Sequence, residues 1–139
     1  MATGWHLTIH SCRSRFAARL IQALGTMTNR LASCSCGKLT VSTQGEPTRV
    51  SICHCLACQK RTGSVFGAQA RFPADAVIFA GQSSEYVRVG DEGTSARFHF
   101  CPECGCTAFY LPDSIPGVVV IRVGGFGEPD FGQPSIAVH

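Results

Sequence analysis

The sequence lacks both a long apolar run and a strong net charge. No uninterrupted apolar stretch in its 139 residues reaches the roughly 18 that a membrane-spanning helix needs, so we expect no membrane partner. Twelve Lys and Arg against nine Asp and Glu give a formal net charge of +3, too weak and too dispersed to predict a nucleic-acid partner. The 45% hydrophobic content excludes general disorder, and the length is that of one domain.

Acidic residues are absent before Glu46, although basic residues are not. The basic residues of this segment are Arg13, Arg15, Arg19, Arg30 and Lys38. Phe16, Leu20 and Leu24 recur every four residues, the spacing of an apolar stripe on a helix. An organelle-targeting peptide has this pattern, and so does a non-native extension upstream of a functional start at Met27. We favour the extension, with residues 1–26 outside the fold and residues 27–139 forming the domain.

The nine cysteines are too few and too clustered for a disulfide scaffold. Seven of them form three short motifs: C-x-C at Cys34 and Cys36, C-x-C-x-x-C at Cys53, Cys55 and Cys58, and C-x-x-C at Cys101 and Cys104. These spacings are typical of thiolates that converge on a metal ion from tight turns. No secretory signal indicates an oxidising compartment, so we expect a reduced, cytoplasmic protein.

A closed zinc site needs four ligands, and two distant pairs commonly supply them. The two-cysteine motifs meet this requirement, and Pro102 and Gly105 suit a zinc knuckle around the second pair. The triad of Cys53, Cys55 and Cys58 remains. Three protein ligands with an open position are typical of a reactive zinc. We therefore predict two Zn²⁺ ions, one structural and one catalytic.

The residues around the triad leave alternatives open. Cys106 or a histidine could complete a second structural site instead. Lys60 and Arg61 follow the triad and could draw an anionic thiol substrate to the metal, or form a solvated turn. In an extended C-x-C segment the His54 side chain points away from its neighbours, so we expect no ligand there. We expect His99 to be a surface residue of its strand.

The sequence after Met27 predicts a mainly β fold. Runs rich in β-branched and aromatic residues predict strands at 38–42, 48–52, 65–72, 76–79, 85–89, 97–100, 107–111 and 118–123. Glycine- and proline-containing turns separate these runs, which favours an antiparallel sandwich or a barrel-like fold. The one helix that we expect is a short segment at residues 56–62, directly behind the triad.

The three cysteine motifs, with their neighbours, resemble one known family. The motifs read Cys34-Ser35-Cys36-Gly37, Cys53-His54-Cys55-Leu56-Ala57-Cys58-Gln59-Lys60 and Phe100-Cys101-Pro102-Glu103-Cys104-Gly105. Over residues 31–139 the chain resembles the glutathione-dependent formaldehyde-activating enzymes, a family that includes centromere protein V. The resemblance implies a β-tent fold, a structural zinc at the two-cysteine motifs and a catalytic zinc at the triad. Members usually continue beyond the position of His139 through a segment containing Trp, which favours a truncated domain here.

Two functions follow as hypotheses. The resemblance implies a carbon–sulfur lyase that joins formaldehyde to glutathione as S-hydroxymethylglutathione, with a glutathione-like thiol and an aldehyde as partners. The alternative is a zinc-stabilised module that binds protein or nucleic acid without catalysis. Acidic and basic residues are interspersed after Met27, which disfavours a broad nucleic-acid surface. The sequence indicates no oligomeric state.

Deleting residues 1–26 should leave the melting temperature within about 2 °C of the full-length value, because the stripe has no counterpart in the β pattern. Thermal unfolding of both proteins by circular dichroism is the measurement. A fall of 10 °C or more would show that the segment belongs to the fold.

Overall fold

Residues 28–139 form a mainly β structure with little helix, as the sequence predicts, in a computed structural model of the protein. The apolar stripe expected within residues 1–26 lies outside these described residues. The strands are β1 (Asn29–Ser33), β2 (Thr40–Gln44), β3 (Arg49–Cys53), β4 (Gly67–Pro73), β5 (Val77–Ala80), β6 (Ser84–Val89), β7 (Ser95–Phe100), β8 (Thr107–Pro112), β9 (Val118–Arg122) and β10 (Ile136–Val138). The helical segments are α2 (Leu56–Thr62) and the 3₁₀ turns η1 (Ala74–Ala76) and η2 (Val123–Gly125). No helix in residues 28–139 is long and apolar enough to cross a membrane.

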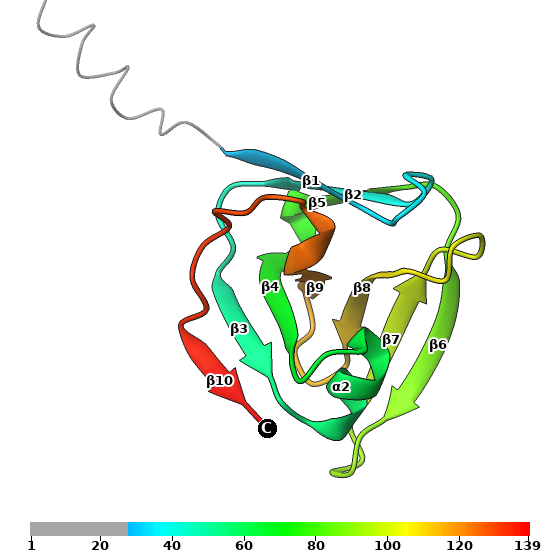
Figure 1. The fold of residues 1–139 in the computed structure, drawn as a ribbon, viewed down its shortest axis with the longest axis vertical. Helices are drawn as coiled ribbons and strands as arrows, with labels where there is room; N and C mark the ends of the chain where they lie inside the picture. Colours follow the sequence, from blue (N-terminus) through cyan, green and yellow to red (C-terminus); the bar gives the residue numbers. More distant parts are fainter. Residues whose placement is uncertain (1–27) are drawn as a thin grey trace, which may run out of the picture.

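The strands form two sheets (Figure 1). A three-stranded sheet has the order β1-β2-β5, and a seven-stranded sheet has the order β10-β3-β4-β9-β8-β7-β6. The pairing is antiparallel throughout except between β10 and β3, which run parallel. In Figure 1 the smaller sheet lies across the top of the larger one, whose two arms spread apart below it.

Two strands of this fold are absent from the sequence-based prediction. β1 contains no β-branched residue, and β10, although it contains Ile and Val, has only three residues, too short a run to predict a strand. The predicted antiparallel pairing holds except at β10, whose backbone pairs in parallel with β3, Ile136 with Ser51 and Val138 with Cys53. That pairing places the end of the chain beside the strand that leads into the triad.

The core lies where the two sheets meet. Its largest fully buried side chains are Phe72, Leu39, Ile121, Val41 and Val119, contributed by both sheets and the turn before β2. Cys34 and Cys101 belong to the same buried cluster, with exposed fractions of 3% and 1%. Two cysteines of the predicted four-ligand set are therefore core residues, so their chemistry is coupled to the packing of the domain.

Strand β7 presents different side chains to its two faces, as the alternation predicts. Phe98 stacks on Tyr110 with ring centroids 4.8 Å apart on one face, and His99 stacks on Phe109 at 4.5 Å on the other. His99 is less exposed than a surface residue of its strand would be, with 17% of its side chain accessible. Stacking against the buried Phe109, with a contact from Ser83, accounts for this partial burial.

The turn between β5 and β6 fits closely against the turn that precedes β2. Gly81 has a φ of +95°, and a Cβ added there would lie 1.9 Å from the carbonyl oxygen of Lys38. Only glycine combines this backbone conformation with so close an approach. The contact holds the turn after β5 against the segment that carries Cys34 and Cys36.

Gly81→Ala should therefore lower the free energy of unfolding by about 2–4 kcal/mol. The alanine would be strained by the positive φ, and its Cβ would overlap the carbonyl oxygen of Lys38. Gly93→Ala is the matched control, with a φ of +79° and open space around the added Cβ. It should cost only about 1 kcal/mol. Urea denaturation of both variants gives the comparison, and equal losses would contradict the close-packed turn.

Candidate metal centres

Four cysteines from two turns that are distant in sequence meet at one point. Cys34 and Cys36 precede β2, whereas Cys101 and Cys104 follow β7. The four Sγ atoms all lie within 4.8 Å of one another, with 3.4 Å between Cys34 and Cys36 and 3.6 Å between Cys36 and Cys101. This is the set that the sequence spacing predicts, and it could hold a metal ion.

The two halves of this four-cysteine site are turns of similar construction. The Cys34 amide donates to the carbonyl oxygen of Leu39 at 2.9 Å, and the Cys101 amide donates to that of Cys106 at 3.0 Å. Gly37 and Gly105 follow the second cysteine of each pair with positive φ, so each turn can close around its sulfurs. Both pairs have the backbone of a zinc knuckle.

The backbone also favours negative charge on the buried sulfur. The amide of Leu39 donates to Cys34 Sγ at 3.2 Å. This hydrogen bond lowers the pKa of the Cys34 thiol to about 6, against the opposing effect of burial. Thiolate is the form that binds metals, so the turn presents its sulfur in a form suited to ligation.

Side chains join the two turns outside the sulfur cluster. Lys38 in the first turn forms an ion pair with Glu103 in the second. Ser35 donates its hydroxyl to Cys106 Sγ at 3.3 Å. Both charged side chains of the ion pair are more than half exposed, so the pair adds little stability. The sulfur cluster is therefore the principal link between the turns.

The triad forms a second group of converging sulfurs. Cys53 ends β3, Cys55 is the N-cap of α2, and Cys58 lies in the first turn of that helix. The Sγ atoms of Cys53 and Cys55 are 3.5 Å apart, and all three sulfurs lie within 4.8 Å of one another. The Cys58 amide donates to Cys55 Sγ at 3.4 Å, so the start of the helix fixes the central sulfur. The triad too could hold a metal ion.

The sulfur separations in both groups fit a zinc ion. A disulfide would require about 2.05 Å between sulfurs, whereas tetrahedral thiolates at about 2.3 Å from zinc lie about 3.8 Å apart. The observed separations of 3.4–3.6 Å are near the second value, and all of the cysteines in residues 28–139 are free. Burial, with the nearby Cys53 sulfur, raises the pKa of the Cys58 thiol to about 12, a preference that a bound cation would reverse.

Within residues 28–139 no fourth cysteine, histidine or carboxylate joins the triad group. Cys106 lies instead beside Ser35 at the four-cysteine site. The ring of His54 stacks on that of His139 at 5.3 Å and lies 5.9 Å from that of Phe66, so it is not part of the sulfur cluster. Neither residue therefore completes the triad in this arrangement.

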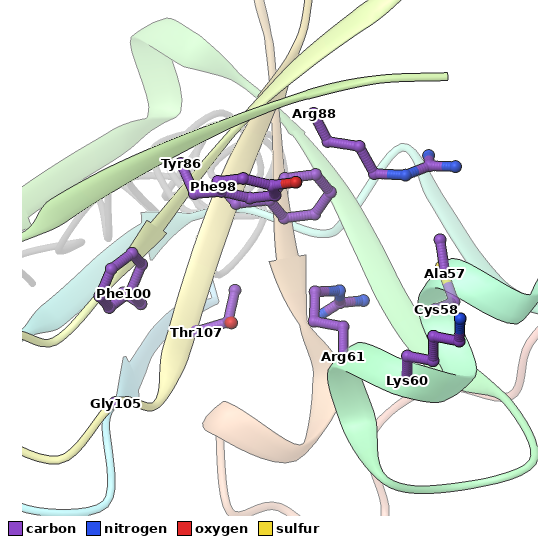
Figure 2. A pocket seen from close by; sticks show the side chains of 10 residues that line it. All are labelled: Ala57, Cys58, Lys60, Arg61, Tyr86, Arg88, Phe98, Phe100, Gly105 and Thr107. Atoms are coloured by element: carbon purple, nitrogen blue, oxygen red, sulfur yellow. The ribbon is translucent and has the colours of Figure 1, made fainter. Parts of the chain in front are cut away.

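A groove of about 570 Å³ adjoins the triad, and Cys58 is part of its wall (Figure 2). Lys60 and Arg61, predicted from their place in the sequence, line it from α2. The Arg61 guanidinium lies 5.5 Å from the centre of the Phe98 ring. Three aromatic residues and one arginine from the paired strands β6 and β7 also line the groove: Tyr86, Arg88, Phe98 and Phe100.

The wall formed by β6 and β7, across the groove from α2, was not predicted from the sequence. Tyr86 and Arg88 are two residues apart, which places both on one face of β6. That alternation is visible in the sequence, but nothing local indicates that this face looks toward α2. The groove is a product of the pairing of β6 with β7 and of the position of the helix.

A buried polar chain lies on the same face of the sheet. The hydroxyl of Tyr110 donates to Gln69 Oε1 at 2.7 Å, and Gln69 Nε2 lies 3.5 Å from Ser51 Oγ. Burial raises the pKa of Tyr110 to about 12, so the phenol is neutral at physiological pH. Because Phe98 stacks on this fixed ring, the polar chain supports the aromatic wall of the groove.

Comparison with known proteins gives one family and one fold. A sequence model of the family described as glutathione-dependent formaldehyde-activating enzyme matches residues 29–139, which contain all three cysteine motifs. The crystal structure of a Rhodobacter sphaeroides protein, a structural genomics target, matches with a TM-score of 0.59 and 19% identity. The match covers 78% of this chain and 99% of that one, and at this identity it concerns the fold alone. No curated protein sequence matches the chain significantly.

The two sulfur groups should respond differently to mutation. Cys101→Ser removes a core ligand of the site that joins the two turns, so it should lower the melting temperature by about 10 °C or more or prevent folding. Cys55→Ser should lower it by only a few degrees, because the triad spans one short segment. Thermal unfolding and metal analysis of both variants provide the measurement.

Each variant should also lose about one equivalent of metal, provided that it can be purified folded. Cys106→Ser is the control and should retain the wild-type metal content, since Cys106 belongs to neither group. The assignment would be contradicted if Cys101→Ser kept wild-type stability, or if Cys55→Ser unfolded as readily as Cys101→Ser.

Proposed function

The chain belongs to the glutathione-dependent formaldehyde-activating enzyme family, and on that premise we propose that it is a zinc-dependent carbon–sulfur lyase acting on thiol–aldehyde adducts. The observation that carries the proposal is the three-thiol group at the wall of a groove, separate from a four-thiol group of which two members lie in the core. A structural role explains the four-cysteine group, but it gives no reason for the triad to adjoin a groove.

The donor sets favour zinc at both positions. Thiolate-only sites select zinc or iron–sulfur clusters among the common biological metals, and the sulfur separations fit a single ion. Cys34, Cys36, Cys101 and Cys104 would hold the structural ion, and Cys53, Cys55 and Cys58 the catalytic one. When bound at the triad, zinc supplies a Lewis acid that stabilises a thiolate or polarises an aldehyde oxygen.

The chain's own residues would orient the substrate. Lys60 and Arg61 place positive charge beside Cys58 and would attract an anionic thiol such as glutathione. The aromatic wall would exclude water from the opposite side of the groove. The helix N-cap fixes the direction of Cys55, so the reacting sulfur would meet a preformed half-shell of ligands.

The proposed reaction is simple and balanced. In the direction of synthesis, the thiol sulfur bonds to the aldehyde carbon, and the carbonyl π pair moves to the oxygen. The proton lost from the thiol ends on that oxygen. In the lyase direction the carbon–sulfur bond breaks and the same proton returns to sulfur. Reduced glutathione and free cysteines are both maintained in the cytoplasm, which we propose as the compartment.

Titration with glutathione should test the site directly. In the zinc-loaded wild type, zinc-edge X-ray absorption should gain a sulfur contribution on addition of glutathione. The protein should also accelerate exchange between glutathione, formaldehyde and S-hydroxymethylglutathione, measured by exchange NMR because the uncatalysed addition is itself fast. Cys55→Ser should abolish both responses, whereas Cys106→Ser should retain them.

A folded, zinc-replete protein that gives neither response, with glutathione or with any other thiol tested, would overturn the enzyme proposal. The alternative, a zinc-stabilised module that binds protein or nucleic acid, would then take its place. The same two measurements therefore separate an enzyme from a binding module.

A further inference from the structure

The groove beside the triad carries positive charge that no carboxylate compensates. Lys60, Arg61 and Arg88 line it, and none of its lining residues is acidic. Within residues 28–139 none of these three cations forms an ion pair, and Arg61 Nε is buried without a hydrogen-bond partner. Glu85, the acid on β6, lies on the opposite face, 3.5 Å from His99. An anionic group of a ligand would supply the missing partner.

The sheet side of the groove is aromatic. Tyr86 pairs with Phe98 across β6 and β7, and Phe98 pairs with Tyr110 across β7 and β8, so the three side chains share one face. Tyr86 is 60% exposed although it is a large aromatic residue. Figure 2 shows Tyr86 and Phe98 close together, with Phe100 farther along the same wall. Such a surface suits the flat or branched apolar body of a ligand.

The cations of α2 and the aromatic wall of β6 and β7 face each other across a space suited to one small molecule. The volume of about 570 Å³ lies within the usual range of small-ligand pockets, about 300–1,000 Å³. In Figure 2 the Arg88 guanidinium points from β6 toward the side where Ala57 and Cys58 lie. Positive charge therefore borders the groove from both walls, and Cys58 of the triad lies on the α2 wall.

This composition opposes a cationic group as strongly as it favours an anion. A glutathione tail carries two carboxylates and one ammonium, and the ammonium would find no carboxylate among the lining residues. Placing it beside three cations costs free energy, because like charges repel and the wall offers no carboxylate to compensate. A carboxylate on an apolar body is not repelled by these cations, and it needs no carboxylate partner from the groove.

We infer that the groove selects a thiol whose body is aromatic or otherwise apolar and carries an anionic group without an ammonium, and that Arg88 determines this preference. The inference rests on the proposed function for its thiol, and on the groove alone for its charge and shape. Such a thiol would lie against the aromatic wall with its anion near Arg88 and its sulfur toward the triad.

Two isosteric thiols test the charge preference. Both 4-(mercaptomethyl)benzoate and 4-(mercaptomethyl)benzylamine offer the same sulfur and ring, but the first is an anion and the second a cation. Calorimetry with the zinc-loaded, full-length protein should give a dissociation constant at least about tenfold lower for the benzoate. Glutathione should bind more weakly than the benzoate as well.

Matched variants assign the preference to Arg88. Arg88→Gln should reduce several-fold the ratio of the dissociation constant of the benzylamine to that of the benzoate. Arg97→Gln is the control, since Arg97 lies on the opposite face of β7 and pairs with Asp113 at 2.9 Å. It removes the same charge without touching the groove, so it should leave the ratio unchanged. Equal binding of the two thiols, equal effects of the two variants, or tighter binding of glutathione would overturn the inference.

A thioether keeps this test separate from the test of the enzyme. The S-methyl derivative of the benzoate has no thiol to ionise, so its binding reports on the groove alone. If it binds in an Arg88-dependent manner while no thiol changes the zinc-edge spectrum, the groove assignment stands and the proposed lyase fails. If thiols change the spectrum without any charge preference, the lyase stands and this inference fails.

Discussion

The packing of four sulfurs at contact distance, between one turn that precedes β2 and another that follows β7, is the constraint on which the rest of the structure depends. Cys34 and Cys101 are buried in the core, so these sulfurs cannot separate without disturbing both sheets. Four thiolates at such separations repel one another unless a cation lies between them. A bound metal ion and the tertiary fold would therefore stabilise each other.

The groove beside the triad depends on the same four-cysteine site. Phe98 and Phe100 lie in the strand that runs directly into Cys101, so fixing Cys101 also fixes the aromatic wall. The triad lies on the other wall, where β3 passes into α2. The four-cysteine site can thus act at a distance by positioning one wall against the other, whereas the triad would act on the substrate.

The sequence predicts the sulfur groups better than it predicts their surroundings. Short cysteine motifs constrain ligand geometry locally, so their division into sets of four and three could be predicted, and the resemblance to the family is confirmed. Strand β10 and the partial burial of His99 could not be predicted, because each depends on a partner distant in sequence. Arg88 was missed for the same reason, since its role follows from facing α2.

The central claim is that the four-cysteine site is closed and the triad keeps a position for substrate. Cadmium-113 NMR of the protein with both zinc ions replaced by cadmium tests it most directly, because each site gives its own resonance. We predict one resonance in the range of four thiolates and a second displaced toward that of mixed ligands, with added thiol moving only the second. Two resonances in the four-thiolate range before any thiol is added would contradict the account.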